Sequence, residues 1–216
     1  MEEISRPGDW AVPRVLNRFL PEEEQAMKFL DGRIWISTID TIRQPDNPRG
    51  DSGEGGLAWR PDNTATLFPE GSEPEKARAL KQYGVAGAEN IEFRGIEFRV
   101  NHPDAYVLCL TTDPKLKGFG DSRVLIADPQ QFLGLVTDAV GEAVGPVTCC
   151  FGKVQYEGRL VHQCIPKPLH PLFVGPKGNR IEKEWRMCWI PDSTTPLQPF
   201  ELHVPEAGRL CSRPRK

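Results

Sequence analysis

The sequence predicts an α+β fold built on a strand-rich, mostly antiparallel sheet, with two main helices and one long irregular loop region. Proline and glycine number 21 and 20 among the 216 residues, a composition that divides a chain into short elements and disfavours a helical bundle. Most apolar stretches are short and rich in β-branched and aromatic residues, as strands are. The length suits one hydrophobic core. We therefore expect a single domain over residues 1–211, followed by a basic tail over residues 212–216.

The first predicted helix opens at Pro21 and ends at Gly32. Proline favours the first turn of a helix, and the three glutamates of residues 22–24 lie where the helix dipole favours negative charge. Glycine commonly ends a helix. The segment 33–39 follows as a strand, because it is rich in β-branched and aromatic residues.

A long polar segment extends from about residue 44 to residue 88. Segments of this kind in a compact domain are usually functional or disordered, and a short helix is expected within it over residues 74–82. The next segment, 91–100, contains a near-repeat whose alternation changes phase at Gly95. This pattern predicts a bulge or tight bend at that glycine.

The second half of the chain is dominated by predicted strands. The most apolar strand, 106–111, is expected at the centre of the sheet. A second helix begins after Asp128, with Pro129 at its first position, and is expected to end at Gly141. Further strands are expected over residues 147–156, 172–174, 183–190 and 200–204.

Composition restricts the classes of partner and the compartment. The 27 basic residues nearly balance the 30 acidic residues, so the chain carries no strong electrostatic signature of nucleic-acid binding. It contains neither an apolar run long enough to span a bilayer nor the layout of a secretion signal, which predicts a cytoplasmic protein without a membrane partner. The six cysteines lack zinc-site spacing and the four histidines stand apart, so we expect neither a metal site nor a hydrolase triad.

Residues 182–186 read Glu-Lys-Glu-Trp-Arg and are predicted to lie on one strand. Because strand side chains alternate, Glu182, Glu184 and Arg186 should share one face while Trp185 points to the other. Two neighbouring carboxylates raise each other's proton affinity and a guanidinium opposes this, a combination that suits stabilisation of developing positive charge. The alternative is an ion-pair ladder on a solvent-exposed face.

A second group of charges, Arg43, Arg49, Asp51 and Glu54, lies in a glycine-rich turn. Arginine can bind phosphate through two parallel hydrogen bonds, and glycines let backbone amides approach an anion. The two carboxylates would repel a phosphate, so the preferred interpretation is an internal arginine–carboxylate latch that holds the long loop. The glycine-containing loop 113–121 is interpreted as a connecting turn, since no helix pattern follows it at once.

Three segments together resemble a family of uncharacterised bacterial proteins. They are residues 32–43 with the acidic turn that follows, the apolar strand 106–112 and the late strand 182–186.

More remotely, the chain is similar to ADP-ribosyltransferases of the arginine, Ser-Thr, Glu-x-Glu type. In that superfamily a split, mostly antiparallel sheet holds NAD in a central cleft. The resemblance implies that Ser37 and Thr38 support the dinucleotide, that Glu184 stabilises the ribosyl cation and that Glu182 orients the acceptor. It also implies that the loop 175–181 contacts the target.

The same resemblance requires an arginine that binds the dinucleotide. Arg14 is the best candidate by position, with Arg33 and Arg43 behind it, and Arg186 lies beside the two glutamates. Two functions remain open at this point. One is an NAD-dependent transferase that binds a nucleotide-like small molecule and modifies an unknown acceptor, and the other is a noncatalytic binding or regulatory protein with a charged cleft.

Overall fold

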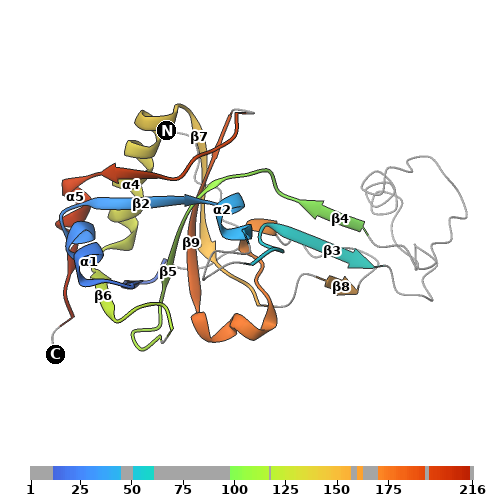
Figure 1. Ribbon diagram of the computed structural model, residues 1–216, viewed down its shortest axis with the longest axis horizontal. Coiled ribbons are helices and arrows are strands. Elements are labelled where there is room, and N and C mark those ends of the chain that lie inside the picture. The colour runs from blue at the N-terminus through green and yellow to red at the C-terminus, as the bar shows by residue number, and fades with distance from the viewer. Residues whose placement is uncertain are drawn as a thin grey trace, which may run out of the picture.

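The fold is α+β with a largely antiparallel sheet, as the sequence predicts (Figure 1). The computed structural model describes residues 12–44, 51–60, 98–116, 118–156, 160–162, 170–192 and 195–214. Within these ranges eight strands form one sheet and three strands form a smaller one. The predicted helix over residues 74–82, the predicted bulge at Gly95 and Arg49 lie outside the described residues.

The elements follow one another in a mixed order along the chain. The strands of the larger sheet are β1 (Leu16–Leu20), β2 (Arg33–Thr38), β5 (Tyr106–Thr111), β6 (Ser122–Ile126), β7 (Val147–Lys153), β9 (Glu184–Pro191), β10 (Phe200–His203) and β11 (Cys211–Ser212). The smaller sheet contains β3 (Gly56–Arg60), β4 (Phe98–Asn101) and β8 (Leu160–His162). The helices are α1 (Glu23–Leu30), α2 (Ile39–Arg43), α4 (Pro129–Val144) and α5 (Pro205–Gly208), with the 3₁₀ helices η1 (Pro171–Phe173) and η2 (Lys177–Glu182).

The larger sheet forks at β5. One edge of β5 pairs with β9 along its whole length, from Tyr106 opposite Trp189 to Thr111 opposite Glu184. Its other edge is shared, because β2 pairs at the Tyr106 end and β1 pairs only at Thr111. Figure 1 shows β2 running away from β5 on a different path from β1 and β6. The space between β1 and β2 is therefore open at the middle of β5.

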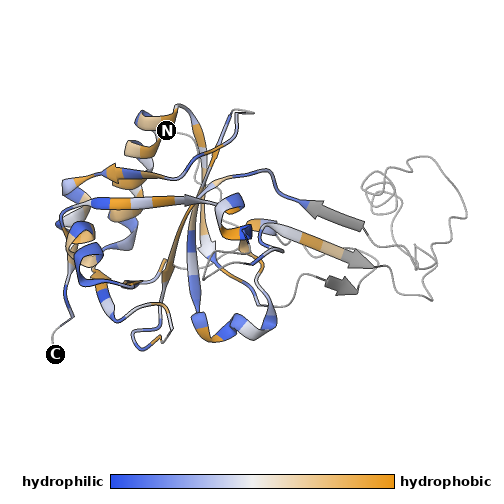
Figure 2. Cartoon of the chain, in the orientation of Figure 1, coloured by the Kyte–Doolittle hydropathy of each residue, from blue (hydrophilic) through white to orange (hydrophobic). Residues whose placement is uncertain are grey.

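The main hydrophobic core lies between the larger sheet and its helices. Helix α4 buries Phe132, Val136 and Val140 in the same cluster as Met187 and Trp189 of β9. Figure 2 shows hydrophobic residues along α4 and on the neighbouring strands. Burial of these apolar side chains is the principal force that holds helix and sheet together.

Gly32 joins α1 to β2 and ends the helix, as predicted. Its backbone has a φ of +79°, a left-handed conformation that glycine adopts without steric cost. A side chain there would also meet the chain after β10, since a Cβ would lie 2.2 Å from the carbonyl oxygen of Val204.

Several predicted boundaries are wrong, for local reasons. Helix α4 continues through Gly141 to Val144, because the glycine with positive φ that follows the helix is Gly145. Residues 172–174 were expected as a strand, but Pro171 opens the 3₁₀ helix η1 and the His170 side chain accepts a hydrogen bond from the Leu172 amide. Strand 147–156 ends at residue 153. Strand β9 begins at Glu184, so the preceding glutamate belongs to η2.

Candidate functional site

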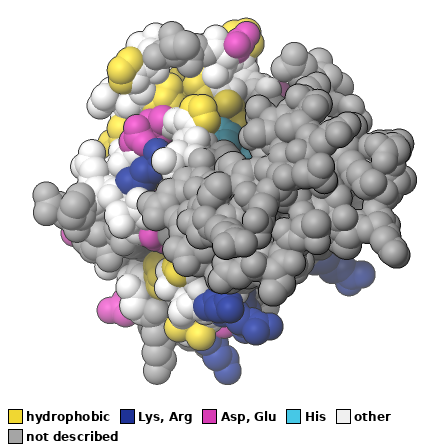
Figure 3. Space-filling view, turned by 90° about the vertical axis from the view of Figure 1, so that its right-hand side faces the viewer, with side chains coloured by type: hydrophobic (Ala, Val, Ile, Leu, Met, Phe, Trp, Pro, Cys, Tyr) yellow, Lys and Arg dark blue, Asp and Glu magenta, His cyan; other side chains and the backbone are white. Residues whose placement is uncertain are grey.

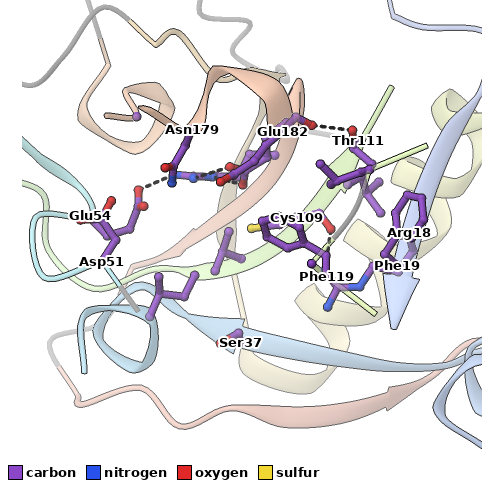
Figure 4. Close-up of a pocket in the computed structure, with 18 of the residues that line it drawn as sticks. Arg18, Phe19, Ser37, Asp51, Glu54, Cys109, Thr111, Phe119, Asn179 and Glu182 are labelled. Atoms are coloured by element: carbon purple, nitrogen blue, oxygen red, sulfur yellow. Dashed lines mark hydrogen bonds and ion pairs between the residues drawn. The ribbon is translucent and has the colours of Figure 1, made fainter. Parts of the chain in front are cut away.

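A cavity of about 620 Å³ lies at the fork of the larger sheet. We call it the fork cavity. It is lined by residues of β1, β2, β5 and β9, by the segment before β3, and by the loops around residues 116–119 and 175–182. Figure 4 shows Glu54 and Glu182 on one side of it, Arg18 and Phe119 on the other, and Cys109 between them. Its volume lies within the range typical of small-molecule sites.

A buried guanidinium joins two carboxylates in the wall of the fork cavity. Arg186 of β9 donates from Nε and Nη2 to the two carboxylate oxygens of Glu184, at 2.9 and 3.0 Å. Its Nη1 donates to a carboxylate oxygen of Glu54 at 2.5 Å and to the carbonyl oxygen of Leu172 at 2.6 Å. Because Arg186 is only 3% exposed, water screens these contacts little. We call these three side chains the buried ion network.

Two carboxylates share one guanidinium in this network, which leaves one net negative charge when all three groups are ionised. Burial alone would lower the pKa of Arg186, but the charges of Glu184 and Glu54 outweigh that effect and raise its pKa well above the ordinary value. Bidentate pairing also holds Glu184 in one orientation. The network is therefore a rigid source of negative potential at the cavity wall.

The start of β9 brings Glu182 and Glu184 to the same cavity by a turn that the sequence does not predict. Lys183, between them, has a left-handed backbone with φ of 43°, so the strict alternation expected over residues 182–186 does not hold. Glu182 lies at the end of η2, and its carbonyl oxygen accepts a hydrogen bond from the Thr111 hydroxyl at 2.6 Å. From Glu184 onward the alternation does hold, with Trp185 in the core and Arg186 facing the cavity.

The Cys109 thiol and the Tyr156 hydroxyl line the fork cavity, and their surroundings oppose ionisation of both. Burial raises the pKa of the Cys109 thiol, and the charge of Glu184 raises it further. Burial and Glu184 likewise raise the pKa of the Tyr156 hydroxyl, whose oxygen accepts a hydrogen bond from the Glu184 amide at 3.1 Å. Both side chains are therefore neutral near pH 7 and serve as polar, uncharged lining.

Arg18 and Ser37 line the fork cavity from its two arms, β1 and β2. Arg18 of β1 donates from Nη1 to the carbonyl oxygen of Cys109 at 2.6 Å, at the part of β5 that neither β1 nor β2 pairs with. Ser37 of β2 is opposite Val107 in the sheet register and also lines the cavity. The fork cavity thus contains an arginine, a serine hydroxyl and carboxylates from different strands.

The segment before β3 is held in place by Arg43. Its guanidinium donates to the carbonyl oxygens of Glu54 and His102 at 2.7 and 3.1 Å, and to the carboxylate of Asp40 at 2.5 Å. Arg43 therefore forms an internal latch. It donates to the backbone carbonyls of Glu54 and His102, and not to the Glu54 carboxylate. The carboxylate of Glu54 reaches into the buried ion network.

The predicted site residues divide into two groups. Ser37, Glu182, Glu184 and Arg186 line the fork cavity together. Arg14, Thr38 and Arg43 are not among its lining residues: Arg14 is exposed before β1, Thr38 caps α2 by accepting a hydrogen bond from the Thr41 amide, and Arg43 forms the latch.

Sequence reasoning missed Arg18 and the contact between Glu54 and Arg186. Arg18 was overlooked because the five-residue strand β1, Leu-Asn-Arg-Phe-Leu, lacks clear alternation. The proximity of Glu54 to Arg186 spans 132 residues, which no local pattern can reveal.

Two histidines that are distant in the sequence meet near the smaller sheet. The rings of His102 and His170 lie with centroids 5.3 Å apart, a contact that their separation in the sequence does not predict. Figure 3, viewed from that end, shows a histidine recessed among hydrophobic and charged side chains. Within the described ranges no group of three or more histidine, cysteine or acidic residues is arranged to hold a metal ion.

Comparison of the chain with protein-family models, curated proteins and solved structures finds no match. In the part of the chain that the structure describes, no helix is both long and apolar enough to cross a membrane. The geometry of the fork cavity is therefore the main evidence on function.

Proposed function

We propose that the protein is an NAD-dependent enzyme of the ADP-ribosyltransferase kind, with its active site in the fork cavity. One observation carries the proposal: Arg18 of β1, Ser37 of β2 and Glu184 of β9 line a single cavity where the sheet divides. An arginine, a serine and a late glutamate on three strands of a split sheet are what the resemblance to that superfamily requires. In this proposal Arg18 takes the place first given to Arg14.

The residues of the cavity fit a dinucleotide chemically. Arg18 offers a guanidinium that can bind phosphate oxygens through two donors. Phe19 and Phe119 offer aromatic faces in the cavity lining, which suit a planar ring. The hydroxyl of Ser37 can hydrogen-bond a ribose. These groups hold and orient NAD, which supplies an ADP-ribosyl group with nicotinamide as its leaving group.

Glu184 contributes electrostatic stabilisation. As the bond from ribose to nicotinamide breaks, positive charge develops on the sugar, and a fixed negative charge nearby lowers the barrier. The buried ion network retains one surplus negative charge and cannot reorient easily, so its effect needs no rearrangement during the reaction. Glu182, half-buried at the cavity wall, orients the acceptor and takes its proton.

A noncatalytic binding or regulatory protein is the second candidate, and one observation favours it. Both carboxylate oxygens of Glu184 accept hydrogen bonds from Arg186, which is the arrangement expected of a carboxylate that only stabilises the fold. In that case the fork cavity binds a ligand without changing it.

Release of nicotinamide from NAD tests the proposal. Purified protein is incubated with NAD and cell lysate as a source of acceptor, and free nicotinamide is measured. Glu184→Gln should lower the rate at least about 100-fold, since loss of one preorganised electrostatic contact commonly costs that much. Glu182→Gln keeps the buried ion network intact and should reduce transfer to the acceptor.

Glu54→Gln is the matched control for stability. It removes the other carboxylate bound to Arg186, so it should weaken the fold about as much as Glu184→Gln does. All variants are assayed at a temperature where circular dichroism shows them folded. If the wild type releases no nicotinamide, or if Glu184→Gln releases it at the wild-type rate, the enzyme proposal fails and the binding candidate gains support.

A further inference from the structure

A second hollow adjoins the fork cavity and differs from it in charge. It has a volume of about 450 Å³ and lies between β1, α1 and β2. Arg18 and Trp35 line both hollows, whereas Lys28 and Arg33 line only the second. The two hollows are therefore neighbours along the same opening between β1 and β2. We call the second one the basic hollow.

The charged lining of the basic hollow is mainly positive. It contains Arg18, Lys28 and Arg33 against one carboxylate, Glu201. The fork cavity has the opposite balance, with Arg18 and Arg186 against Asp51, Glu54, Glu182 and Glu184. Lys28 also contacts Glu24 at 2.8 Å, but both side chains are exposed, and such surface pairs exchange partners at little cost. An anion is thus favoured in the basic hollow and disfavoured at the acidic wall of its neighbour.

Trp35 is a large aromatic side chain that the fold leaves in water. It is 56% exposed, on the same face of β2 as Arg33 and Ser37, while the alternate residues Ile34 and Ile36 are in the core. An exposed indole beside arginine and lysine side chains can stack on a nucleobase while the cations bind its phosphates. This combination distinguishes a nucleotide from a simple anion.

We infer that the basic hollow binds a nucleoside phosphate, with the base on Trp35 and the phosphates held by Arg18, Arg33 and Lys28. The inference builds on the proposed function, because one source of this group is the adenosine diphosphate half of NAD, reaching out of the fork cavity past Arg18. The other source is a separate nucleotide that binds beside the cofactor. Both present the same chemistry to the hollow.

Titration of the full chain with ADP, followed by calorimetry, tests the inference. ADP should bind the wild type, and its affinity should fall as salt concentration rises because the contacts are ionic. Trp35→Ala and Arg33→Glu should each weaken binding by about tenfold or more, as expected for loss of a stacking platform or of a phosphate contact. Glu201→Gln should strengthen binding.

Arg209→Glu is the matched charge reversal. Arg209 is an exposed arginine that follows α5 and lines neither hollow, so its variant should bind ADP as the wild type does. Thermal melting confirms that each variant is folded, and Trp35→Phe, which keeps an aromatic face, should restore most of the affinity lost in Trp35→Ala. The inference is overturned if the wild type does not bind ADP, or if Trp35→Ala and Arg33→Glu bind it as tightly as the wild type does.

A repeat titration with saturating NAD identifies the source of the nucleotide. Competition indicates the cofactor's own adenosine half, and undiminished ADP binding indicates a separate nucleotide. The two proposals can fail independently. If ADP binding depends on Trp35 and Arg33 but no nicotinamide is released, the nucleotide site is supported and the enzyme proposal fails. If nicotinamide is released without such ADP binding, the nucleotide site is refuted and the enzyme proposal stands.

Discussion

Two cation–carboxylate contacts at the start of β9 have nearly the same length and very different surroundings. Arg186 meets Glu184 at 2.9 Å with side chains 3% and 10% exposed. Lys183 meets Asp113 at 3.0 Å with side chains 58% and 21% exposed. The difference in burial, and not the distance, decides how much the fold depends on each contact.

The physical reason is the cost of leaving one partner alone. A buried carboxylate that loses its cation keeps the full penalty of desolvation, which is several kcal/mol. An exposed carboxylate that loses its lysine is simply hydrated, and the pair contributes at most about 1 kcal/mol. Four predictions test the role of burial, beginning with the largest expected effect and ending with the smallest.

Removal of the shared cation should have the largest effect. Arg186→Leu leaves Glu54 and Glu184 buried together without a positive charge, so the free energy of unfolding should fall by about 3–5 kcal/mol. Urea denaturation followed by circular dichroism measures the loss. Adding Glu54→Leu and Glu184→Leu to the same chain should restore part of it, because an apolar replacement of a buried ionic group is often tolerated. If Arg186→Leu alone is as stable as the wild type, then burial does not decide how much the fold depends on this contact.

Removal of one carboxylate should cost less than removal of the shared cation. Glu54→Gln and Glu184→Gln each leave Arg186 with one carboxylate and retain an amide oxygen as acceptor, so each should lower the free energy of unfolding by about 1–3 kcal/mol. The same denaturation assay compares them. A much smaller effect of Glu54→Gln would indicate that Glu184 alone balances the guanidinium.

Stability at alkaline pH tests whether burial near β9 also opposes ionisation of the Cys149 thiol. Cys149 of β7 lies opposite Trp189 of β9, and burial raises the pKa of its thiol from an ordinary value of 9.0 to about 11. Between these two pH values the unfolded chain loses the proton while the folded chain keeps it, so the free energy of unfolding falls as pH rises.

For Cys149 the decrease in the free energy of unfolding should approach about 2–3 kcal/mol and level off above the pKa of the folded state. Urea midpoints measured between neutral and alkaline pH for the wild type and for Cys149→Ala give the comparison. The alanine variant should show a shallower decline over that interval. Identical slopes would mean that the folded thiol ionises as easily as the unfolded one.

The exposed pair should show the smallest effect. Lys183→Ala removes the contact with Asp113 and should change the free energy of unfolding by less than about 1 kcal/mol, an effect that fades in high salt. The hydrogen bond from the backbone amide of Lys115 is the main cause that lowers the pKa of Asp113, and Lys183 lowers this pKa further. The carboxylate therefore stays ionised without the lysine. A loss comparable to that of Arg186→Leu would show that exposure is a poor guide here.

The sequence predicts those parts of the fold that local chemistry determines. Proline and glycine bound α1, Asp128 and Pro129 begin α4, and the apolar run of β5 marks the central strand. These features depend on neighbours in the chain, so one sequence suffices to find them.

The candidate site is only partly predictable, because its geometry depends on distant contacts. The Glu-x-Glu-x-Arg pattern predicts Glu184 and Arg186 as site residues. The left-handed turn at Lys183 is not predicted, because glycine and asparagine are the residues that usually indicate such a turn and neither is present there. Arg18 enters the cavity through a strand that is defined by pairing with β6 and not by its own pattern. The fork itself is a property of three strands and cannot be seen in any one of them.

The guanidinium of Arg186 also couples distant parts of the fold. Its partners come from positions 54, 172 and 184, and the farthest of them is 132 residues away. Because these acceptors come from separate elements, the burial of Arg186 requires the larger sheet and the segment before β3 to be assembled together. Detachment of that segment would leave the guanidinium with unsatisfied donors and admit water to the inner wall of the fork.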